Sequence, residues 1–199
     1  MSLQIQPVVL SGQVVRLEPL TPAHSQGLYN RGRVKADWAY LPRSCFVDQA
    51  DTRHWIDEAL NTPGHMPFAI VDVARGRAVG STRYMNIRPE HRSLEIGWTW
   101  LGQEWQRTAV NTEAKLLLLS HAFDRLGCVR VEFKTDTRNE RSQRALARIG
   151  AKREGVMRNH MIVQNNYLRD SVYFSVIAAE WPEVKSHLKA LLAGDAAPA

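Results

Sequence analysis

The sequence predicts a single α/β domain of the α+β type, in which a mixed sheet carries helices on its faces. The expected elements follow the order β-α-α-β-β-β-α-β-α-β-β-α, which is neither a regular alternation of strands and helices nor a run of hairpins. The chain has 199 residues, of which 44% are hydrophobic, and no linker divides it, so one core is expected. We expect the domain to span residues 1–194 and residues 195–199 to form a disordered tail.

The first third of the chain predicts one strand and two helices. A short strand is expected over Val14–Leu17, and Thr21-Pro22 signals the start of a helix that reaches about Arg33. An aromatic-rich loop follows over residues 35–44. A second helix is expected over Asp51–Leu60.

The middle of the chain predicts three strands and the clearest helix. The strands are expected over residues 68–73, 78–87 and 93–101. The helix is expected over Thr112–Leu126, with Asn111 as its N-cap. Glu113 favours the positive end of the helix dipole, and Gly127 supplies the left-handed residue that ends the helix.

The last third predicts a strand, a helix, two strands and a final helix. Apolar and charged residues alternate over residues 129–134, which indicates a half-buried strand. Asn139 is the expected N-cap of the helix that Gly150 ends. Two strands, over residues 154–163 and 169–177, precede an amphipathic helix that begins at Trp181-Pro182.

Positive charge is concentrated in the second half of the chain. Residues 130–169 contain ten Lys or Arg and four Asp or Glu, and this excess of +6 equals the formal charge of the whole chain. Such a balance indicates a polyanionic partner, either nucleic acid or a phosphorylated cofactor. Acidic residues interrupt the basic ones, and no RNA-binding aromatic motif is present, which argues against nucleic acid. A solvated helix face is the alternative for some of these residues.

Other function classes are excluded by patterns that the sequence lacks. No apolar run approaches the roughly 20 residues of a membrane span, and the start of the chain lacks a secretion signal. Cys45 and Cys128 have no disulfide or metal-site spacing, so a reducing cytoplasm is expected. No cluster of His, Cys, Asp and Glu has the spacing of metal ligands, so no metal is expected.

The most informative stretch is residues 94–115, LEIGWTWLGQEWQRTAVNTEAK. A strand ends there in a polar loop that opens directly onto a helix. Free backbone N–H groups at the positive end of the helix dipole make such a junction an anion site. Arg107 adds a formal charge. The alternative is a helix that begins after a loop and binds nothing.

These residues resemble the GNAT N-acetyltransferase superfamily, in particular its ribosomal-protein N-terminal (Rim-type) branch. That branch carries Gln/Arg-x-x-Gly-x-Gly/Ala ahead of a helix, and residues 106–111 (QRTAVN) match in place, followed by Thr112-Glu113-Ala114. Residues 129–151 are similar to the strand, the Asn-x-x-Ser helix and the closing Gly-Ala of the branch. Glu154-Gly155 and residues 169–172 (RDSV) complete the pattern.

The resemblance implies a mostly antiparallel sheet that is splayed in the middle and carries helices on both faces. It also implies acetyl-CoA as cosubstrate and direct transfer to a primary amine, either a protein N-terminus or a small amine, in a ternary complex. The residues that it places at acetyl-CoA are Trp100, Leu101, Gln106, Arg107, Thr108, Ala109, Val110, Asn111, Thr112, Asn139 and Ser142. Ala109 and Asn111 fill the two glycine positions, where glycine would allow a positive φ. The loop is expected to stay usable, because Asn tolerates the left-handed region and Ala adds one methyl group.

The resemblance also implies catalytic roles. A backbone N–H on the strand Gly97–Leu101, where a bulge splays two strands, would bind the carbonyl oxygen. Glu95 is the candidate for accepting the amine proton, with a surface carboxylate as the equal alternative. Ser142 is the candidate for protonating or hydrogen-bonding the leaving thiolate, and the alternative is a hydroxyl in the first turn of a helix. Tyr173 is a weaker candidate acid, and the alternative for it is a packed strand aromatic.

The acceptor amine cannot be identified from the sequence. Trp38, Tyr40 and Trp98 are candidates for lining its pocket, although aromatic residues at such positions are more often core. A homodimer is left open. Two other function hypotheses remain. The filled glycine positions favour a non-catalytic sensor of acyl-CoA. A nucleic-acid-binding module is the second, and the acidic residues that interrupt the basic ones argue against it.

Overall fold

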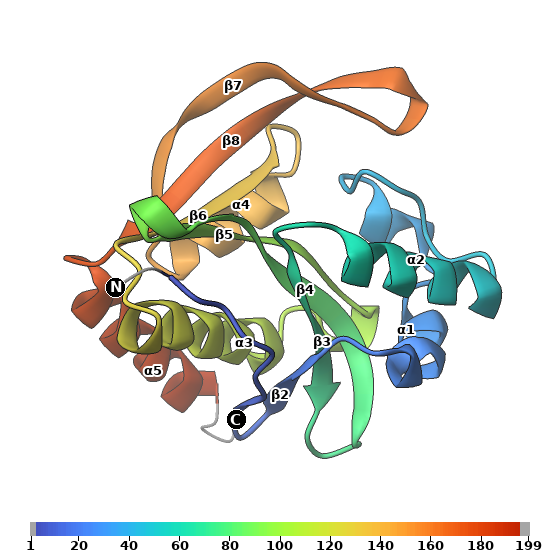
Figure 1. Ribbon diagram of the computed structural model, residues 1–199, viewed down its shortest axis with the longest axis horizontal. Helices are drawn as coiled ribbons and strands as arrows, with labels where there is room; N and C mark the ends of the chain where they lie inside the picture. Colours follow the sequence, from blue (N-terminus) through green and yellow to red (C-terminus); the bar gives the residue numbers. More distant parts are fainter. Residues whose placement is uncertain (1–2, 196–199) are drawn as a thin grey trace.

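A computed structural model describes residues 3–195 and has one eight-stranded mixed sheet (Figure 1). The strand order across the sheet is β1-β2-β3-β4-β5-β6-β8-β7. Neighbouring strands are antiparallel except β5 and β6, which are parallel. The strands are β1 (Leu10–Ser11), β2 (Val15–Pro19), β3 (Met66–Asp72), β4 (Arg77–Arg88), β5 (Ser93–Leu101), β6 (Arg130–Asp136), β7 (Lys152–Val163) and β8 (Tyr167–Ile177). The predicted fold class is therefore confirmed.

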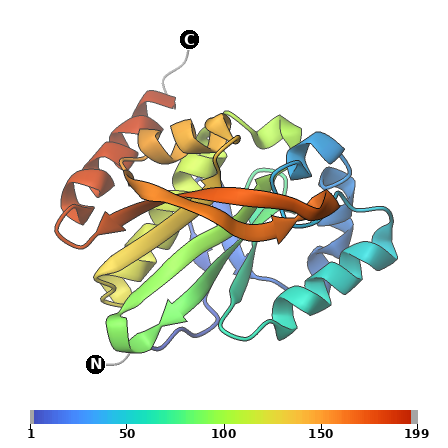
Figure 2. The same cartoon turned by 90° about the horizontal axis from the view of Figure 1, so that it is seen from above.

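Helices cover both faces of the sheet (Figures 1 and 2). They are α1 (Ser25–Arg31), α2 (Gln49–Asn61), α3 (Ala109–Ser120), α4 (Glu140–Arg148) and α5 (Trp181–Asp195). Alternation along β3 shows the two layers: Phe68 and Ile70 pack into the core beneath α3, α4 and α5, whereas Ala69 and Val71 pack into the core beneath α1 and α2. Period-two alternation in a strand buried on both faces produces these two separate cores.

The parallel pair β5–β6 opens after three residues. Ser93, Leu94 and Glu95 pair with residues 130–132, and beyond them the two strands separate. On its other edge β5 carries a bulge against β4: Gly97 pairs with Arg83 and Trp100 with Ser81, so β5 has one extra residue between these pairs. Trp98 in this bulge has a φ of +51°. The expected bulge in residues 97–101 is confirmed, and it lies where the sheet is splayed.

Several predicted helix boundaries are wrong for identifiable reasons. The N-cap of α3 is Thr108, whose hydroxyl accepts a hydrogen bond from the backbone N–H of Val110, and Asn111 is already inside the helix. Glu113 lies beyond the first turn of α3. The α-helical part ends at Ser120, and a π-helical turn over residues 121–125 continues it toward Gly127, whose φ is +67°. Gly127 is therefore in the left-handed conformation that was predicted.

The front of the chain is more divided than predicted. The helix expected over residues 21–33 is a 3₁₀ turn, Pro22–His24, followed by the short helix α1. The strand β1 was not predicted, because two residues carry no detectable periodicity. Of the expected tail, Asp195 belongs to α5, and residues 196–199 lie outside the described part of the chain.

Glu113 joins α3 to the start of the sheet. Its side chain is 6% exposed, and its carboxylate accepts hydrogen bonds from the backbone N–H groups of Gln13, Val14 and Val15 at 2.9, 2.7 and 2.6 Å. Gly12 leaves room for this carboxylate, since a Cβ there would lie 2.4 Å from Glu113 Cδ. The prediction that Glu113 interacts with its own helix dipole is wrong, because it binds the N–H groups of another element. Over residues 3–195, no helix is long and apolar enough to cross a membrane.

Candidate active site

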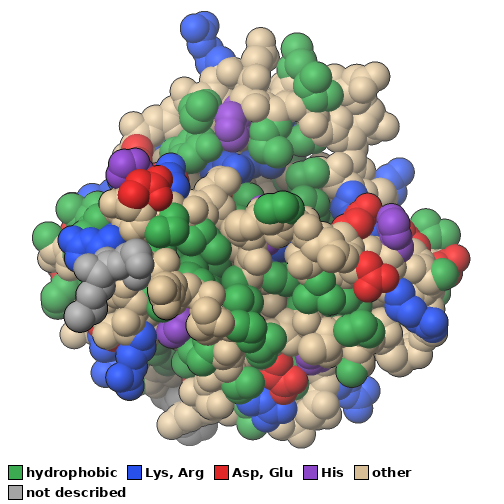
Figure 3. All heavy atoms as spheres, in the orientation of Figure 1, with side chains coloured by type: hydrophobic (Ala, Val, Ile, Leu, Met, Phe, Trp, Pro, Cys, Tyr) green, Lys and Arg blue, Asp and Glu red, His purple; other side chains and the backbone are tan. Residues whose placement is uncertain are grey.

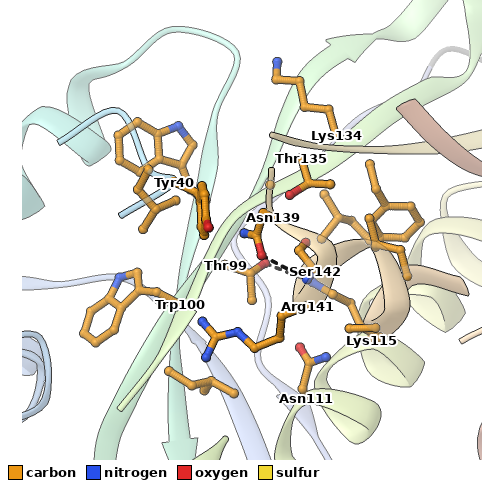
Figure 4. A pocket seen from close by; sticks show the side chains of 18 of the residues that line it. Tyr40, Thr99, Trp100, Asn111, Lys115, Lys134, Thr135, Asn139, Arg141 and Ser142 are labelled. Carbon is orange, nitrogen blue, oxygen red and sulfur yellow. Dashed lines mark hydrogen bonds between the residues drawn. The ribbon is translucent and has the colours of Figure 1, made fainter. Parts of the chain in front are cut away.

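The opening between β5 and β6 is the mouth of a cavity of about 570 Å³. One wall comes from β5 and the loop that follows it, and the opposite wall comes from β6 and α4. The base is formed by α3, which contributes Asn111 and Lys115 (Figure 4). Because α3 begins directly after the loop that follows β5, one continuous stretch of sequence builds two sides of the cavity.

One end of the cavity is the N-terminus of α3. The chain turns there through Arg107, whose φ is +61°. Ala109 and Asn111 are helical, so neither of the two glycine positions has the positive φ that glycine would allow. The residue with a positive φ, at which glycine would carry less backbone strain, is Arg107. Ala109 and Asn111 lie in the first turn of α3.

Gln106 holds this end of the cavity together. Its amide group donates to the carbonyl oxygen of Leu101 at 2.9 Å and to Asp37 Oδ1 at 2.8 Å. Its carbonyl oxygen accepts a hydrogen bond from Arg141 Nη1 at 2.7 Å. Gln106 therefore connects the end of β5, residues 35–44 before α2 (the front loop) and α4.

The residues predicted to bind acetyl-CoA divide into two groups. Those that line the cavity are Trp100, Leu101, Gln106, Arg107, Thr108, Asn111, Asn139 and Ser142. Val110 packs into the core instead, and Thr112 is fully buried with its hydroxyl accepting a hydrogen bond from Arg148 Nη2 at 2.7 Å. Ala109 is not among the lining residues of this cavity. The side chains of Val110 and Thr112 are therefore structural, and these two residues could reach a ligand only through their backbone.

The cavity is strongly electropositive. Its charged lining residues are the cations Arg107, Lys115, Lys134, Arg141, Arg144, Arg148 and Arg169 and the anions Asp37 and Glu95. Three of these cations come from α4, on the side that faces the N-terminus of α3. The helix dipole and these guanidinium groups act in the same direction, so this end of the cavity favours a polyanion.

The α4 wall is positioned by its N-cap. The Asn139 side chain accepts a hydrogen bond from the backbone N–H of Ser142 at 3.1 Å, so the predicted N-cap is confirmed (Figure 4). Ser142, three residues later, lines the cavity. The cap therefore fixes the orientation of the turn that carries Ser142.

At the other end of the cavity lies Glu95, which is 1% exposed. Its Oε2 accepts a hydrogen bond from Asn86 Nδ2 at 2.7 Å and forms an ion pair with Lys134 Nζ at 3.2 Å. Its Oε1 would lie 3.2 Å from a Cβ on Gly97, so Glu95 faces the same side of β5 as Gly97, as alternation predicted. The alternative of a surface carboxylate is wrong, because the side chain is buried in the wall of the cavity.

The aromatic residues predicted to line an acceptor pocket are placed differently. Tyr40 and Trp98 line the cavity. Trp38 is fully buried among Phe46, Trp55 and Trp100, with its ring centroid 5.0 Å from that of Trp100. Trp38 is therefore a core residue, and its assignment to the acceptor pocket is wrong. Trp100 belongs to this aromatic cluster and also reaches the cavity.

Tyr173 is not part of the cavity wall. It pairs with Lys134 across β8 and β6, and its hydroxyl lies 3.3 Å from His160 Nε2. Burial raises its pKa above the usual value. The packed strand aromatic, which was the alternative for this residue, is the better description.

A hairpin formed by β7 and β8 covers the Glu95 end of the cavity. Gln164 at its tip donates hydrogen bonds to the carbonyl oxygens of Trp38, Leu41 and Arg43 at 3.0, 2.7 and 2.7 Å. In the space-filling view the hairpin stands over a hollow in the surface (Figure 3). The front loop and the hairpin, more than 120 residues apart in sequence, therefore enclose this end together.

Sequence reasoning missed six of the seven cations that line the cavity, which are Lys115, Lys134, Arg141, Arg144, Arg148 and Arg169. Arg169 is 5% exposed, and burial lowers its pKa. Lys115 is 5% exposed, and burial lowers its pKa to about 7. Lys134 forms the ion pair with Glu95 described above. The one signal for Lys115 in the sequence is its position directly before four leucines of a helix. That pattern does not show whether the lysine lies on a buried or an exposed face of the helix. Within residues 3–195, no group of three or more His, Cys, Asp and Glu could hold a metal ion.

The known proteins that this chain resembles carry the names of acetyltransferases. The chain is 32% identical to a GCN5-related N-acetyltransferase from Brucella melitensis, with a TM-score of 0.90 over 94% of this chain and 86% of that one. It is 38% identical to a "putative acetyltransferase" from T. thermophilus, with a TM-score of 0.88 over 95% and 99%. It is 32% identical over 106 residues to the Bacillus subtilis "Putative ribosomal N-acetyltransferase YdaF". That match spans 53% of this chain and 57% of YdaF.

A family model supplies the assignment. The model described as "Acetyltransferase (GNAT) domain" matches residues 15–152, a range that contains the splayed strands, the N-terminus of α3 and the turn that carries Ser142. The likeness to YdaF agrees with the resemblance to the Rim-type branch. The chain belongs to the GNAT acetyltransferase family.

Proposed function

We propose that this protein transfers an acetyl group from acetyl-CoA to a primary amine in a ternary complex. The observation that carries the proposal is the electropositive cavity, which runs from the N-terminus of α3 to a buried carboxylate through the opening between β5 and β6. A long thioester that carries phosphates at one end and a reactive carbonyl at the other is complementary to this distribution of charge. The residues present therefore fit the ligand that the family implies.

The phosphate end of the ligand would lie against the first turn of α3. Backbone N–H groups there lack helical partners, and Arg107, Arg141, Arg144 and Arg148 supply positive charge. Guanidinium groups suit phosphate because they offer paired donors in a fixed plane. Asn139 and Ser142 would contact the arm that leads toward the opening.

The acyl end would lie against the bulge of β5. A backbone N–H of that strand would donate to the carbonyl oxygen as it gains charge. Glu95, on the same face as Gly97, would accept the amine proton directly or through water. Ser142 would donate a hydrogen bond to the sulfur. Because all reactants are held in one cavity, positioning contributes much of the rate.

The acceptor is proposed at the level of its reacting group. A protein N-terminus is supported by the likeness to YdaF, whose printed name refers to ribosomal acetylation, and a small amine fits the enclosed Glu95 end. Cys45 and Cys128 are both free thiols, which agrees with a proposed cytoplasmic location.

The first test is binding. Acetyl-CoA at millimolar concentration should raise the melting temperature, because a ligand that prefers the native state stabilises it. Arg141→Ala should weaken the affinity about tenfold, the cost of one charged contact of about 1.4 kcal/mol. Arg153→Ala is the matched control, since Arg153 is an exposed arginine of β7 that does not line the cavity. An unchanged melting temperature would exclude acetyl-CoA as the ligand.

The second test is turnover. Free thiol released from acetyl-CoA is followed across a panel of peptides with different N-terminal residues and a panel of small amines. An acetylated product identified by mass spectrometry supports the proposal. Tight binding without turnover on any amine would favour the acyl-CoA sensor instead.

A further inference from the structure

Lys115 is a buried lysine in the base of the cavity. Its side chain is 5% exposed, and Nζ donates a hydrogen bond to Thr99 Oγ1 at 2.9 Å. The hydroxyls of Thr99 and Thr82 are in turn 2.8 Å apart. The ring of Phe133, with its centroid 5.9 Å from Nζ, borders the ammonium group on the side of β6. Two neutral hydroxyls and an aromatic ring are weak compensation for a buried charge.

The position of Lys115 links it to the reacting atoms. Thr99 lies in the bulged part of β5, beside Trp98, which is the backbone proposed above to bind the acyl carbonyl. Lys115 lies on the same face of α3 as Asn111, one turn further from the phosphate end. Figure 4 shows Lys115 entering the cavity from α3, with Ser142 of α4 and Thr99 of β5 around it. A hydrogen bond to Thr99 therefore places Nζ at the level of the bulge.

The surroundings make Lys115 able to exchange a proton near neutral pH. Burial lowers its pKa from 10.5 to about 7, and burial is the one cause of the shift. The other charged groups that line the cavity are Glu95 on β5, Lys134 on β6, Arg107 before α3, Arg141, Arg144 and Arg148 on α4, Arg169 on β8 and Asp37 in the front loop. Glu113 on α3 itself is bound to the N–H groups of residues 13–15. Burial alone lowers the pKa, so Lys115 holds its proton more weakly than an exposed lysine does.

We propose that Lys115 Nζ is the proton donor to the sulfur that leaves the acyl thioester. The assignment rests on the acyl transfer proposed above. The amine nitrogen forms a bond to the carbonyl carbon, and the carbon–sulfur bond breaks with its electron pair going to sulfur. Lys115 gives one proton to that sulfur, which becomes a thiol, and is left as a neutral amine. The proton lost by the substrate nitrogen goes to Glu95 or to water, and water restores the proton on Lys115.

Proton affinities favour this direction of transfer. A thiol has an ordinary pKa of about 8.5, above that of Lys115, so transfer from the ammonium group to a thiolate is downhill. A serine hydroxyl holds its proton far more strongly than a thiol does, so Ser142 serves as a hydrogen-bond donor and Lys115 supplies the proton. The two groups approach the sulfur from α4 and α3.

The test compares Lys115→Met with Lys115→Arg. Methionine keeps the length and removes the proton, whereas arginine keeps the positive charge but does not release a proton near pH 7. Both variants should lower kcat about 10²-fold, the low end for general acid catalysis, and should change the affinity for acetyl-CoA less than threefold. Wild-type kcat should fall as the pH rises through about 7, and Lys115→Met should lose this falling limb.

Each part of the test has a result that overturns the assignment. Wild-type kcat in Lys115→Arg would mean that a fixed positive charge is sufficient, and wild-type kcat in Lys115→Met would mean that the lysine is structural. A titration of the lysine ¹³Cε resonances by NMR needs no substrate: one resonance should titrate near pH 7 and be missing in Lys115→Met, and its absence from the wild type overturns the proposal. If wild-type protein binds acetyl-CoA but turns over no amine, the proposed transfer fails and the assignment fails with it. Turnover that both Lys115 variants leave unchanged refutes the role of Lys115 but not the proposed acyl transfer.

Discussion

The hydrogen bonds between the Glu113 carboxylate and the backbone at the start of β2 should contribute strongly to the free energy of unfolding. One buried carboxylate accepts three backbone N–H groups, those of Gln13, Val14 and Val15. Glu113→Gln keeps the size of the side chain and one acceptor oxygen, but it turns the other oxygen into an NH₂ group that faces N–H donors. At least one hydrogen bond is lost, and the other two lose their charge.

The magnitude follows from these contacts. Hydrogen bonds to a charged group contribute about 1.5–3 kcal/mol each, against about 1 kcal/mol for neutral ones. One lost bond and two weakened bonds therefore correspond to about 2.5–7 kcal/mol in the free energy of unfolding. For a domain of this size, that is a fall of about 5–28 °C in melting temperature.

The assay is urea unfolding of Glu113→Gln, Gly12→Ala and the double variant. Gly12→Ala should also destabilise the protein, because the new Cβ would lie 2.4 Å from Glu113 Cδ. Since both changes disturb one contact, the double variant should lose less than the sum of the two. Glu183→Gln is the matched control, an exposed glutamate on α5. A loss below about 1 kcal/mol for Glu113→Gln, or strict additivity, would refute the reasoning.

Four further substitutions test the cavity. Glu95→Gln should lower kcat about 10²-fold with little change in acetyl-CoA affinity, and full kcat on an identified acceptor would show that Glu95 is structural. Ala109→Gly and Asn111→Gly should each leave acetyl-CoA affinity within threefold by calorimetry, because the left-handed residue is Arg107, and a loss above tenfold would contradict this. Lys115→Met should stabilise the protein on the order of 4 kcal/mol below about pH 7, where the folded wild type bears the cost of a buried charge. Between about pH 7 and 10.5 the unfolded wild type binds more protons than the folded one, so wild-type stability rises with pH and the gap should close; a gap independent of pH would contradict a buried titrating lysine.

Features that are local in sequence could be predicted. The order of elements, the strand Ser93–Leu101, the Asn139 cap and the left-handed Gly127 each depend on residues within a few positions of one another. The junction of β5, loop and α3 is also continuous in sequence, which is why Gln106, Arg107, Thr108 and Asn111 were found, whereas the three arginines of α4 were missed. The error in the N-cap, Thr108 instead of Asn111, has a local cause too: both residue types cap helices, and the sequence does not show which one does.

The Glu95 end of the cavity could not be predicted in the same way. Tyr40, Glu95, Lys134, Met161 and Arg169 meet there from five separate segments, and no short-range pattern brings those segments together. Gln164, with its three bonds to the front loop, looks from the sequence like an ordinary residue of a turn. Trp38 shows the converse error, because an aromatic residue in a loop indicates a pocket and a core equally well.

Lys115 shows where hydrophobic periodicity fails as a guide to function. In a predicted amphipathic helix a lysine is assigned to the solvent face, since a charge is costly to bury. Here the helix packs against a sheet that opens above it, so the face of α3 that carries Asn111 and Lys115 meets a cavity instead of packed side chains. The opening depends on the pairing of β5 with β6, which joins residues 93–95 to residues 130–132 and then stops. Whether the lysine is buried therefore depends on where the pairing of β5 with β6 ends, which the local sequence around Lys115 does not show.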